Sequence, residues 1–224
     1  MAKMLIIALP LLATFVVVGC AADPGGGQAG LSATASGPNV LARAKELEDR
    51  GQREQAAAVL RVAVAQNPDD RMLRAAYGKS LIGIGSLSEA EQVLAKAHTP
   101  DNPDPSVLAA QGVVASQKGD QATAQAYFRR ALNLRPGDPS IEANLAISLA
   151  MAGDRQEAER VARTAAGSPA ADARVRQTLA MVLTLQGKDA EAEQVYRQDL
   201  SPDQAASNVE MMKKMRGGSK GRSA

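Results

Sequence analysis

Residues 107–154, with the sequence VLAAQGVVASQKGDQATAQAYFRRALNLRPGDPSIEANLAISLAMAGD, contain the pattern from which the fold can be inferred. Gly119 and Gly153 lie 34 positions apart in this stretch (153 − 119 = 34). A glycine directly after a helix readily takes the left-handed conformation that ends the helix. We therefore expect two helical segments, 107–118 and 121–134, with a tight turn at Gly119 between them.

The same spacing runs through five units of the chain. The repeated positions are a turn glycine (Gly51, Gly85, Gly119, Gly153, Gly187), two alanines (Ala56, Ala90, Ala124, Ala158, Ala192; Ala63, Ala97, Ala131, Ala165), a small residue (Ala44, Gly78, Gly112, Ala146, Ala180) and a large one (Leu60, Leu94, Phe128, Ala162, Tyr196). Asp199 interrupts the second alanine series. We expect the small residues to let the two helices of a unit approach closely, and the large residues to fill the gap between neighbouring units.

This period and these repeated positions resemble the tetratricopeptide repeat (TPR) family. The resemblance implies an all-α, right-handed superhelical solenoid of about five helix-turn-helix repeats. The repeats are expected at 37–70, 71–104, 105–138, 139–172 and 173–201, within a domain spanning 40–201. Residues 202–215 are expected to form a solvating cap helix, because Ala205, Val209 and Met212 have helical spacing. A partner-binding helix that is released on demand is the alternative.

Composition agrees with an all-helical chain that binds no nucleic acid. Strong helix formers dominate and aromatic residues make up only 2 % of the sequence, so the core must be built from closely packed small residues. The formal net charge is +2, and the dense basic stretch is confined to the end of the chain. Residues 216–224 are therefore expected to be a disordered basic tail, with weak contact to anionic phospholipid or cell-wall polymer as the alternative.

Several helix starts are marked by side chains that can cap the first turn. The pairs Asp104-Pro105, Asp138-Pro139 and Ser201-Pro202 each place an N-cap residue before a proline at the first helical position. Ser88 with Glu91, and Asp154 with Glu157, have the three-residue spacing of a capping box.

The N-terminus has the form of an export signal. A basic start at Lys3 precedes the apolar run 4–18, which is shorter than the about 20 residues that span a bilayer. The run ends at Val17-Val18-Gly19-Cys20, which resembles the lipobox of bacterial lipoproteins. That resemblance implies that residues 1–19 are removed and that Cys20 is acylated, which would anchor the chain permanently in a membrane. Residues 20–39 are rich in Gly, Ala, Ser and Pro and are expected to be a flexible tether.

We find no constellation of residues that suggests catalysis. His98 is the only histidine, and the repeat register places it in a solvent-facing turn rather than in a cleft. The sequence contains neither a phosphate-binding glycine loop nor a second ligand for a zinc site. It therefore predicts a protein that is not an enzyme, holds no cofactor or metal ion, and has no small-molecule substrate.

The repeat resemblance also implies a partner-binding groove, because the first helix of each TPR unit faces the concave surface. The predicted groove residues are Met72, Lys79, Ile82, Val113, Gln117, Ile147, Met151, Gln177, Met181 and Leu185. The same mapping includes Ala143 and Thr184. A row of exposed apolar residues suits an apolar or amphipathic segment of a partner protein. If the helical phase is wrong by one position, several of these residues belong to the core instead.

The whole arrangement resembles the TadD lipoproteins of tight-adherence (Flp) pilus systems. The residues that carry this resemblance are the lipobox, the tether, the central units 107–154 and the segment SPDQAASNVEMM at 201–212. It implies a lipid anchor in the outer membrane facing the periplasm, and a secretin or another pilus or secretion component as partner. A cell-envelope adaptor for peptidoglycan hydrolases or for outer-membrane barrel assembly is the alternative.

Overall fold

The computed structural model describes the backbone of residues 37–220 and the side chains of residues 38–216. The export signal 1–19, Cys20, the tether as far as residue 36, and residues 221–224 lie outside this range. Among the described residues, no helix is long and apolar enough to cross a membrane.

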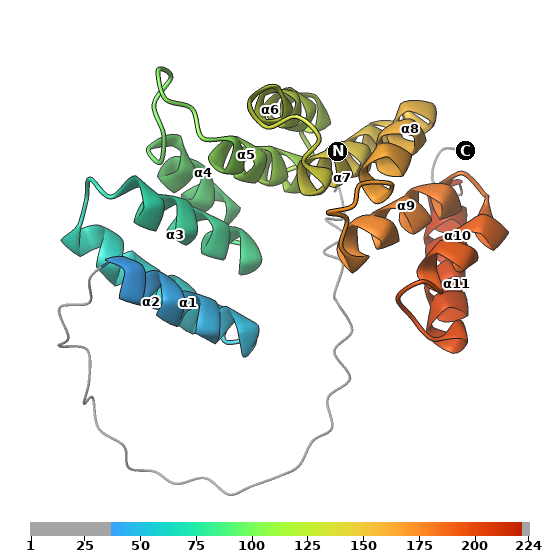
Figure 1. Cartoon of the computed structure of the whole chain (residues 1–224), viewed down its shortest axis with the longest axis horizontal. Helices are drawn as coiled ribbons and strands as arrows, with labels where there is room; N and C mark the ends of the chain where they lie inside the picture. The colour runs from blue at the N-terminus through green and yellow to red at the C-terminus, as the bar shows by residue number, and fades with distance from the viewer. Residues whose placement is uncertain (1–36, 221–224) are drawn as a thin grey trace, which may run out of the picture.

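The regular elements between residues 37 and 220 are eleven α-helices. They are α1 (Gly37–Asp49), α2 (Arg53–Gln66), α3 (Arg71–Gly83), α4 (Leu87–Ala95), α5 (Pro105–Gln117), α6 (Gln121–Leu134), α7 (Pro139–Ala152), α8 (Arg155–Ala166), α9 (Ala173–Leu185), α10 (Asp189–Tyr196) and α11 (Pro202–Lys220). Ten of them form five antiparallel pairs that follow one another from α1–α2 to α9–α10, and α11 comes last (Figure 1). The prediction of an all-α TPR solenoid is confirmed.

The turn glycines end the first helix of each pair as the sequence predicts. Gly119 has a φ of 90° and Gly153 a φ of 93°, and the three other glycines of the series also have positive φ values. Only glycine adopts this backbone conformation without steric cost. The second helix of the third unit then begins at Gln121, where the side chain of Asp120 accepts a hydrogen bond from the backbone N–H of Thr123 at 3.0 Å.

The small and large repeated positions lie against each other within one unit, which corrects the expectation that the large residues fill the gap between units. A Cβ atom added at Gly78 would lie 2.5 Å from Leu94, and one added at Gly112 would lie 2.6 Å from the ring of Phe128. Leu94 and Phe128 are both buried. In these two pairs, a large buried side chain of the second helix therefore packs directly onto a glycine of the first helix.

Buried side chains form two main clusters that meet at α5. The N-terminal cluster extends from Val40 in α1 to Val107, Ala110 and Val114 in α5. The C-terminal cluster begins with Leu108 and Ala115 on the other side of α5 and ends in α11, where the cap residues Ala205, Val209 and Met212 are buried. Each unit packs only against the units next to it, so the buried core extends along the solenoid and does not surround a single centre.

Most of the expected helix caps are present, and one is wrong. The carboxylates of Asp104, Asp138 and Asp154 accept backbone hydrogen bonds at the starts of α5, α7 and α8. The expected capping box at Ser88 does not form, because α4 begins at Leu87 and Ser88 lies inside it. Glu91 instead pairs with Lys118 of the next unit at 2.6 Å.

The boundaries differ from the expected ones at both ends. Helix α1 begins at Gly37, so the last three residues of the expected tether are helical. Helix α11 begins at Pro202 as expected but continues to Lys220, into the expected disordered tail. Arg216 is held in place because its guanidinium donates to the carbonyl of Thr184 and pairs with Asp189 at 2.9 Å.

Candidate interaction groove

The ten predicted groove residues are all accessible in the structure. Met72 is 71 % exposed and Met151 is 57 % exposed, and the other eight side chains are exposed or half-buried. Ala143 and Thr184 were assigned to the groove wrongly, because both are fully buried. Ala143 packs with Ala165 and Val175 between α7, α8 and α9. The accessibility of the ten does not test their role, so partner binding stays a prediction.

A cavity of about 700 Å³ opens in the N-terminal half of the molecule. Helices α1 and α3 line it together with Leu60 of α2, residues 97, 98 and 102–104 of the α4–α5 connection, Pro105 at the start of α5 and Arg135 from the α6–α7 loop. Met72 and Lys79 of the predicted groove belong to this lining. The cavity thus brings together side chains that are up to 94 positions apart in the sequence (135 − 41 = 94, from Leu41 to Arg135).

The α4–α5 connection shapes the cavity because α4 stops early. The segment 97–105 reads AHTPDNPDP, and its prolines lack the backbone N–H and the conformational freedom that a helix requires. The chain turns instead at Thr99–Asn102, where the N–H of Asn102 donates to the carbonyl of Thr99 at 3.1 Å. The closely spaced prolines could have indicated from the sequence that α4 ends early. We expected a regular inter-repeat turn there instead.

His98 lines this cavity and is half-buried, which corrects the expectation of a solvent-facing turn residue. Its Nδ1 accepts a hydrogen bond from the backbone N–H of Asp104 at 3.3 Å. Burial, and next the charge of Arg130, lower the pKa of the imidazole below its ordinary value. A neutral ring keeps the Nδ1 lone pair that this hydrogen bond needs, so His98 holds the connection against the start of α5.

Positive side chains predominate in the cavity wall. Lysine and arginine contribute Lys45, Arg71, Lys79 and Arg135, whereas the carboxylates are Glu48 and Asp104. Lys45 pairs with Asp49 at 2.9 Å, and Arg135 pairs with Asp138 at 3.3 Å. Lys79 donates to the hydroxyl of Ser106 at the start of α5. Sequence reasoning included Lys79 but missed Arg71 and Arg135, since nothing local indicates that they face the same cavity.

The C-terminal half of the groove has a different chemistry, because its residues carry no charge. Val113 of α5, Ile147 of α7 and Met181 of α9 are half-buried, and Gln117 and Gln177 are the polar side chains among them. Beside Met151, the Nε2 atom of Gln121 lies 3.8 Å from the methionine sulfur. The predicted groove therefore consists of one charged and one neutral part.

Comparison with known proteins places the fold. The chain resembles TTC0263, a thermophilic TPR protein of Thermus thermophilus, with a TM-score of 0.68 and 17 % identity over 80 % of this chain and 97 % of that one. It also resembles PilW, a type IV pilus biogenesis factor, with a TM-score of 0.65 and 20 % identity over 77 % and 81 % of the two chains. Among curated proteins, no sequence matches the chain.

A further similar structure is the Cut9–Hcn1 hetero-tetramer of the APC/C, with a TM-score of 0.63 and 19 % identity. The match covers 78 % of this chain but only 36 % of that one, so the chain spans about a third of this relative's length. At such identities the likeness concerns the fold alone. A profile of the family described as tetratricopeptide repeat matches residues 33–168, more than half of the sequence. The chain belongs to the tetratricopeptide repeat family.

Proposed function

We propose that this TPR protein is a non-enzymatic scaffold, anchored by acyl chains on Cys20 in the bacterial outer membrane and facing the periplasm. In this proposal it assists the assembly or localisation of a tight-adherence (Flp) type IV pilus or of its secretin. The TPR fold provides a protein-protein interaction scaffold. The likeness to PilW, a type IV pilus biogenesis factor, supports the pilus system as its setting.

One observation carries the binding role, namely the row of accessible apolar side chains on successive first helices. Val113, Ile147 and Met181 come from α5, α7 and α9, and each retains access to solvent although it is apolar. The free energy falls when another apolar surface covers such a row of accessible apolar side chains. A partner segment supplies that cover without any change in the fold.

The test is a double substitution in the groove, Val113→Glu with Ile147→Glu. Two unpaired carboxylates would have to be desolvated when the partner binds, so binding should fail. Neither residue belongs to the small or large repeated positions, so the helical circular dichroism spectrum should stay unchanged. We expect loss of co-purification with the secretin and loss of pilus assembly, both measured in cells that carry the variant as their only copy.

The matched control is Ala122→Glu with Gln156→Glu, which adds the same charge at exposed positions of α6 and α8. It should assemble pili normally. A groove variant that unfolds would show that Val113 and Ile147 are core residues. A variant that folds and still supports assembly would exclude this groove as the binding site.

The anchor is tested separately with Cys20→Ser. Without the thiol no acyl chain can be attached, so the protein should lose its fatty-acid label and leave the outer-membrane fraction. Metabolic labelling and membrane fractionation measure both effects. If the wild-type protein carries no fatty-acid label, the proposed lipid anchor is refuted. That result would not bear on the proposed partner-binding groove.

A further inference from the structure

The groove carries opposite kinds of surface at its two ends. We name the wall formed by Arg71, Lys79 and Arg135 around the cavity the basic pocket. We name Val113, Ile147, Met151, Gln177 and Met181 the neutral stripe. Lys79, Val113, Ile147 and Met181 are equivalent positions one period apart (113 − 79 = 34), so the pocket continues into the stripe along the first helices of successive units.

Two of the three cations of the basic pocket are available to an added anion, whereas Arg135 already pairs with Asp138 at 3.3 Å. Arg71 forms no ion pair within the described part of the chain, and the partner of Lys79 is a neutral hydroxyl. The nearby carboxylate of Asp104 already accepts two backbone N–H groups, from Ser106 at 2.7 Å and from Val107 at 3.2 Å. Glu48 lines the cavity too, but among the described residues neither carboxylate pairs with Arg71 or Lys79, so these two cations can attract a carboxylate of a binding partner.

Apolar surface lies directly beside these cations. Met72 follows Arg71 in α3 and is 71 % exposed, and Ala75 and Ala76 line the same cavity. Methionine adapts its shape to different apolar side chains, so the pocket suits a segment in which acidic and apolar residues alternate along one helix face.

The neutral stripe selects against charge. An ionised group placed on Val113, Ile147 or Met181 would lose its hydration and find no opposite charge among the stripe residues. Uncharged apolar side chains lose nothing there and bury surface. The stripe and the pocket therefore favour different parts of one ligand.

We infer that the groove binds an amphipathic protein segment with a fixed polarity. Its carboxylate-bearing end lies in the basic pocket, and its uncharged apolar end lies along the neutral stripe. This inference rests on the proposed scaffold function for the existence of a protein partner, and it adds the chemistry and the direction of the bound segment.

Selection from a display library of random peptides tests the inference on the immobilised full chain. Peptides that bind the wild type should be enriched in Asp and Glu at one end and in Leu, Met or Phe at the other. The variant Arg71→Glu with Lys79→Glu should reverse the charge preference and enrich Lys and Arg at the first end. The variant Val113→Glu with Ile147→Glu should remove the apolar preference at the second end.

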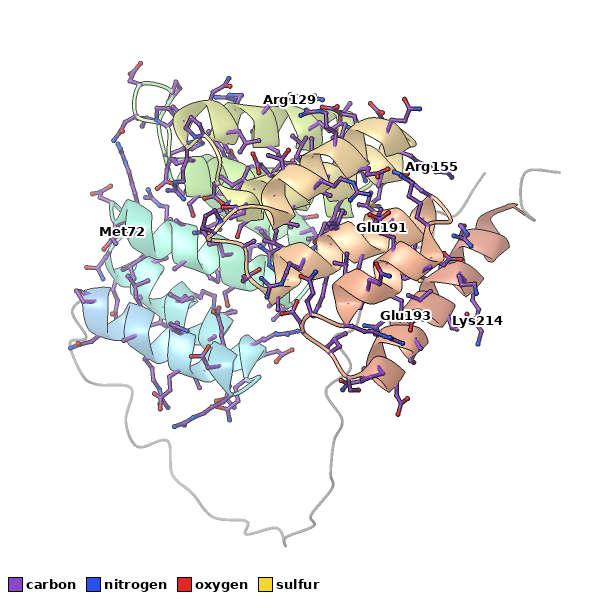
Figure 2. The ribbon with its side chains drawn as sticks, turned by 45° about the vertical axis from the view of Figure 1, so that its right-hand side comes forward. Met72, Arg129, Arg155, Glu191, Glu193 and Lys214 are labelled. Atoms are coloured by element: carbon purple, nitrogen blue, oxygen red, sulfur yellow. The ribbon has the colours of Figure 1, made fainter. Side chains whose placement is uncertain are left out.

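A matched control places the same charges elsewhere, as Arg61→Glu with Arg129→Glu. Both residues are exposed and belong to second helices, and Figure 2 shows Arg129 on α6, well away from Met72. This control should select the same peptides as the wild type. For one selected acidic-apolar peptide, fluorescence anisotropy should show about tenfold weaker binding to the Arg71→Glu, Lys79→Glu variant than to the control.

Added salt should narrow this difference, because it screens partly exposed charges. The inference would be overturned if the peptides selected by the wild type had no acidic end. It would also be overturned if the Arg71→Glu, Lys79→Glu variant still selected acidic peptides. A library from which no peptide is enriched would overturn it as well. The scaffold function is judged independently by pilus assembly in the Ile147 and Val113 variant, so the two can fail separately.

Discussion

At the scale of single residues, the small repeated positions are set by the side chains that lie over them. Gly112 lies inside α5, where glycine is usually unfavourable by about 1 kcal/mol relative to alanine. The ring of Phe128 occupies the space that a Cβ would need, with three ring atoms between 2.6 and 2.9 Å of it. Close packing therefore outweighs helix propensity at this position.

Gly112→Ala is expected to destabilise the protein. Overpacking costs about 1–3 kcal/mol, which exceeds the gain in helix propensity. Gly83→Ala is the control, because a Cβ there would meet only the side chain of Arg53 at 4.0 Å. Urea denaturation should give a lower midpoint for the first variant and an equal or higher one for the second. Equal shifts in the same direction would show that the Gly112 contact is loose.

A comparison of two equivalent serines shows where one hydrogen bond is missing. Ser148 donates to the side-chain oxygen of Gln121 at 2.8 Å, whereas the hydroxyl of Ser80 is buried without a partner. The two serines lie two periods apart (148 − 80 = 68), and Arg53 stands where Gln121 stands in the later unit (121 − 53 = 68).

Arg53→Gln is therefore expected to stabilise the protein by supplying the missing acceptor. A buried hydrogen bond of this kind contributes about 1 kcal/mol. The measurement is the free energy of unfolding in urea. Arg53→Ala removes the arginine without adding an amide, and should not show the gain. If both variants have the same stability, the hydroxyl of Ser80 is satisfied in another way.

At the scale of elements, α11 packs against the last repeat through buried apolar side chains and through polar contacts of Arg216. Ala205 and Val209 belong to the C-terminal core, and Met212 of the same helix is buried. Arg216 then reaches across to Asp189 at the start of α10, and its hydrogen bond lowers the pKa of that carboxyl below the ordinary value of 3.8. Figure 2 shows the neighbouring Lys214 directed away from the ribbon.

This ion pair makes part of the stability depend on pH. The pKa of Asp189 is lower in the folded chain than in the unfolded chain. The pair therefore contributes fully to the free energy of unfolding at a pH above 3.8, the ordinary pKa of the carboxyl. This contribution is lost as the pH falls through the pKa that Asp189 has in the folded chain. Arg216→Gln should therefore be less stable than the wild type near neutral pH, and the difference should shrink in acid. The part of this stability difference that is due to the hydrogen bond between Arg216 and the Thr184 carbonyl should remain at low pH.

Urea denaturation of both proteins across this pH range measures the difference. Lys214→Gln serves as the control, because Lys214 forms no ion pair among the described residues. Its stability should follow the wild type at every pH. A difference between Arg216→Gln and wild type that does not vary with pH would show that the pair with Asp189 contributes nothing.

At the scale of the whole molecule, the two core clusters predict two regions that open separately. Leu60 belongs to the N-terminal cluster and Leu183 to the C-terminal one, and both are fully buried. In a solenoid each unit is stabilised by its own contacts and by its neighbours, so a local defect spreads over a short distance.

Leu60→Ala should cost about 2–5 kcal/mol, mainly in α1 to α4. Amide hydrogen exchange should become faster there and stay slow in α8 to α10. Leu183→Ala should give the opposite pattern, and α5 should respond to both because it contributes to both clusters. Uniform acceleration over all helices in either variant would mean that the molecule unfolds as one cooperative unit.

The repeat period, the turn glycines, most N-caps and the buried face of α11 could all be predicted from the amino-acid sequence. These features depend on interactions within one unit, where backbone hydrogen bonds and helical spacing leave little choice. Even the early end of α4 was present locally, in the prolines of segment 97–105.

Which distant residues meet could be learned only from the packed molecule. Arg71 and Arg135 line one cavity, Arg216 reaches Thr184, and Phe128 covers Gly112. Each of these contacts depends on how helices are rotated against each other, within a pair and between successive pairs. That rotation results from packing many side chains at once, and no local pattern specifies it. The proposed chemistry of the predicted groove, basic at one end and neutral at the other, depends on this rotation.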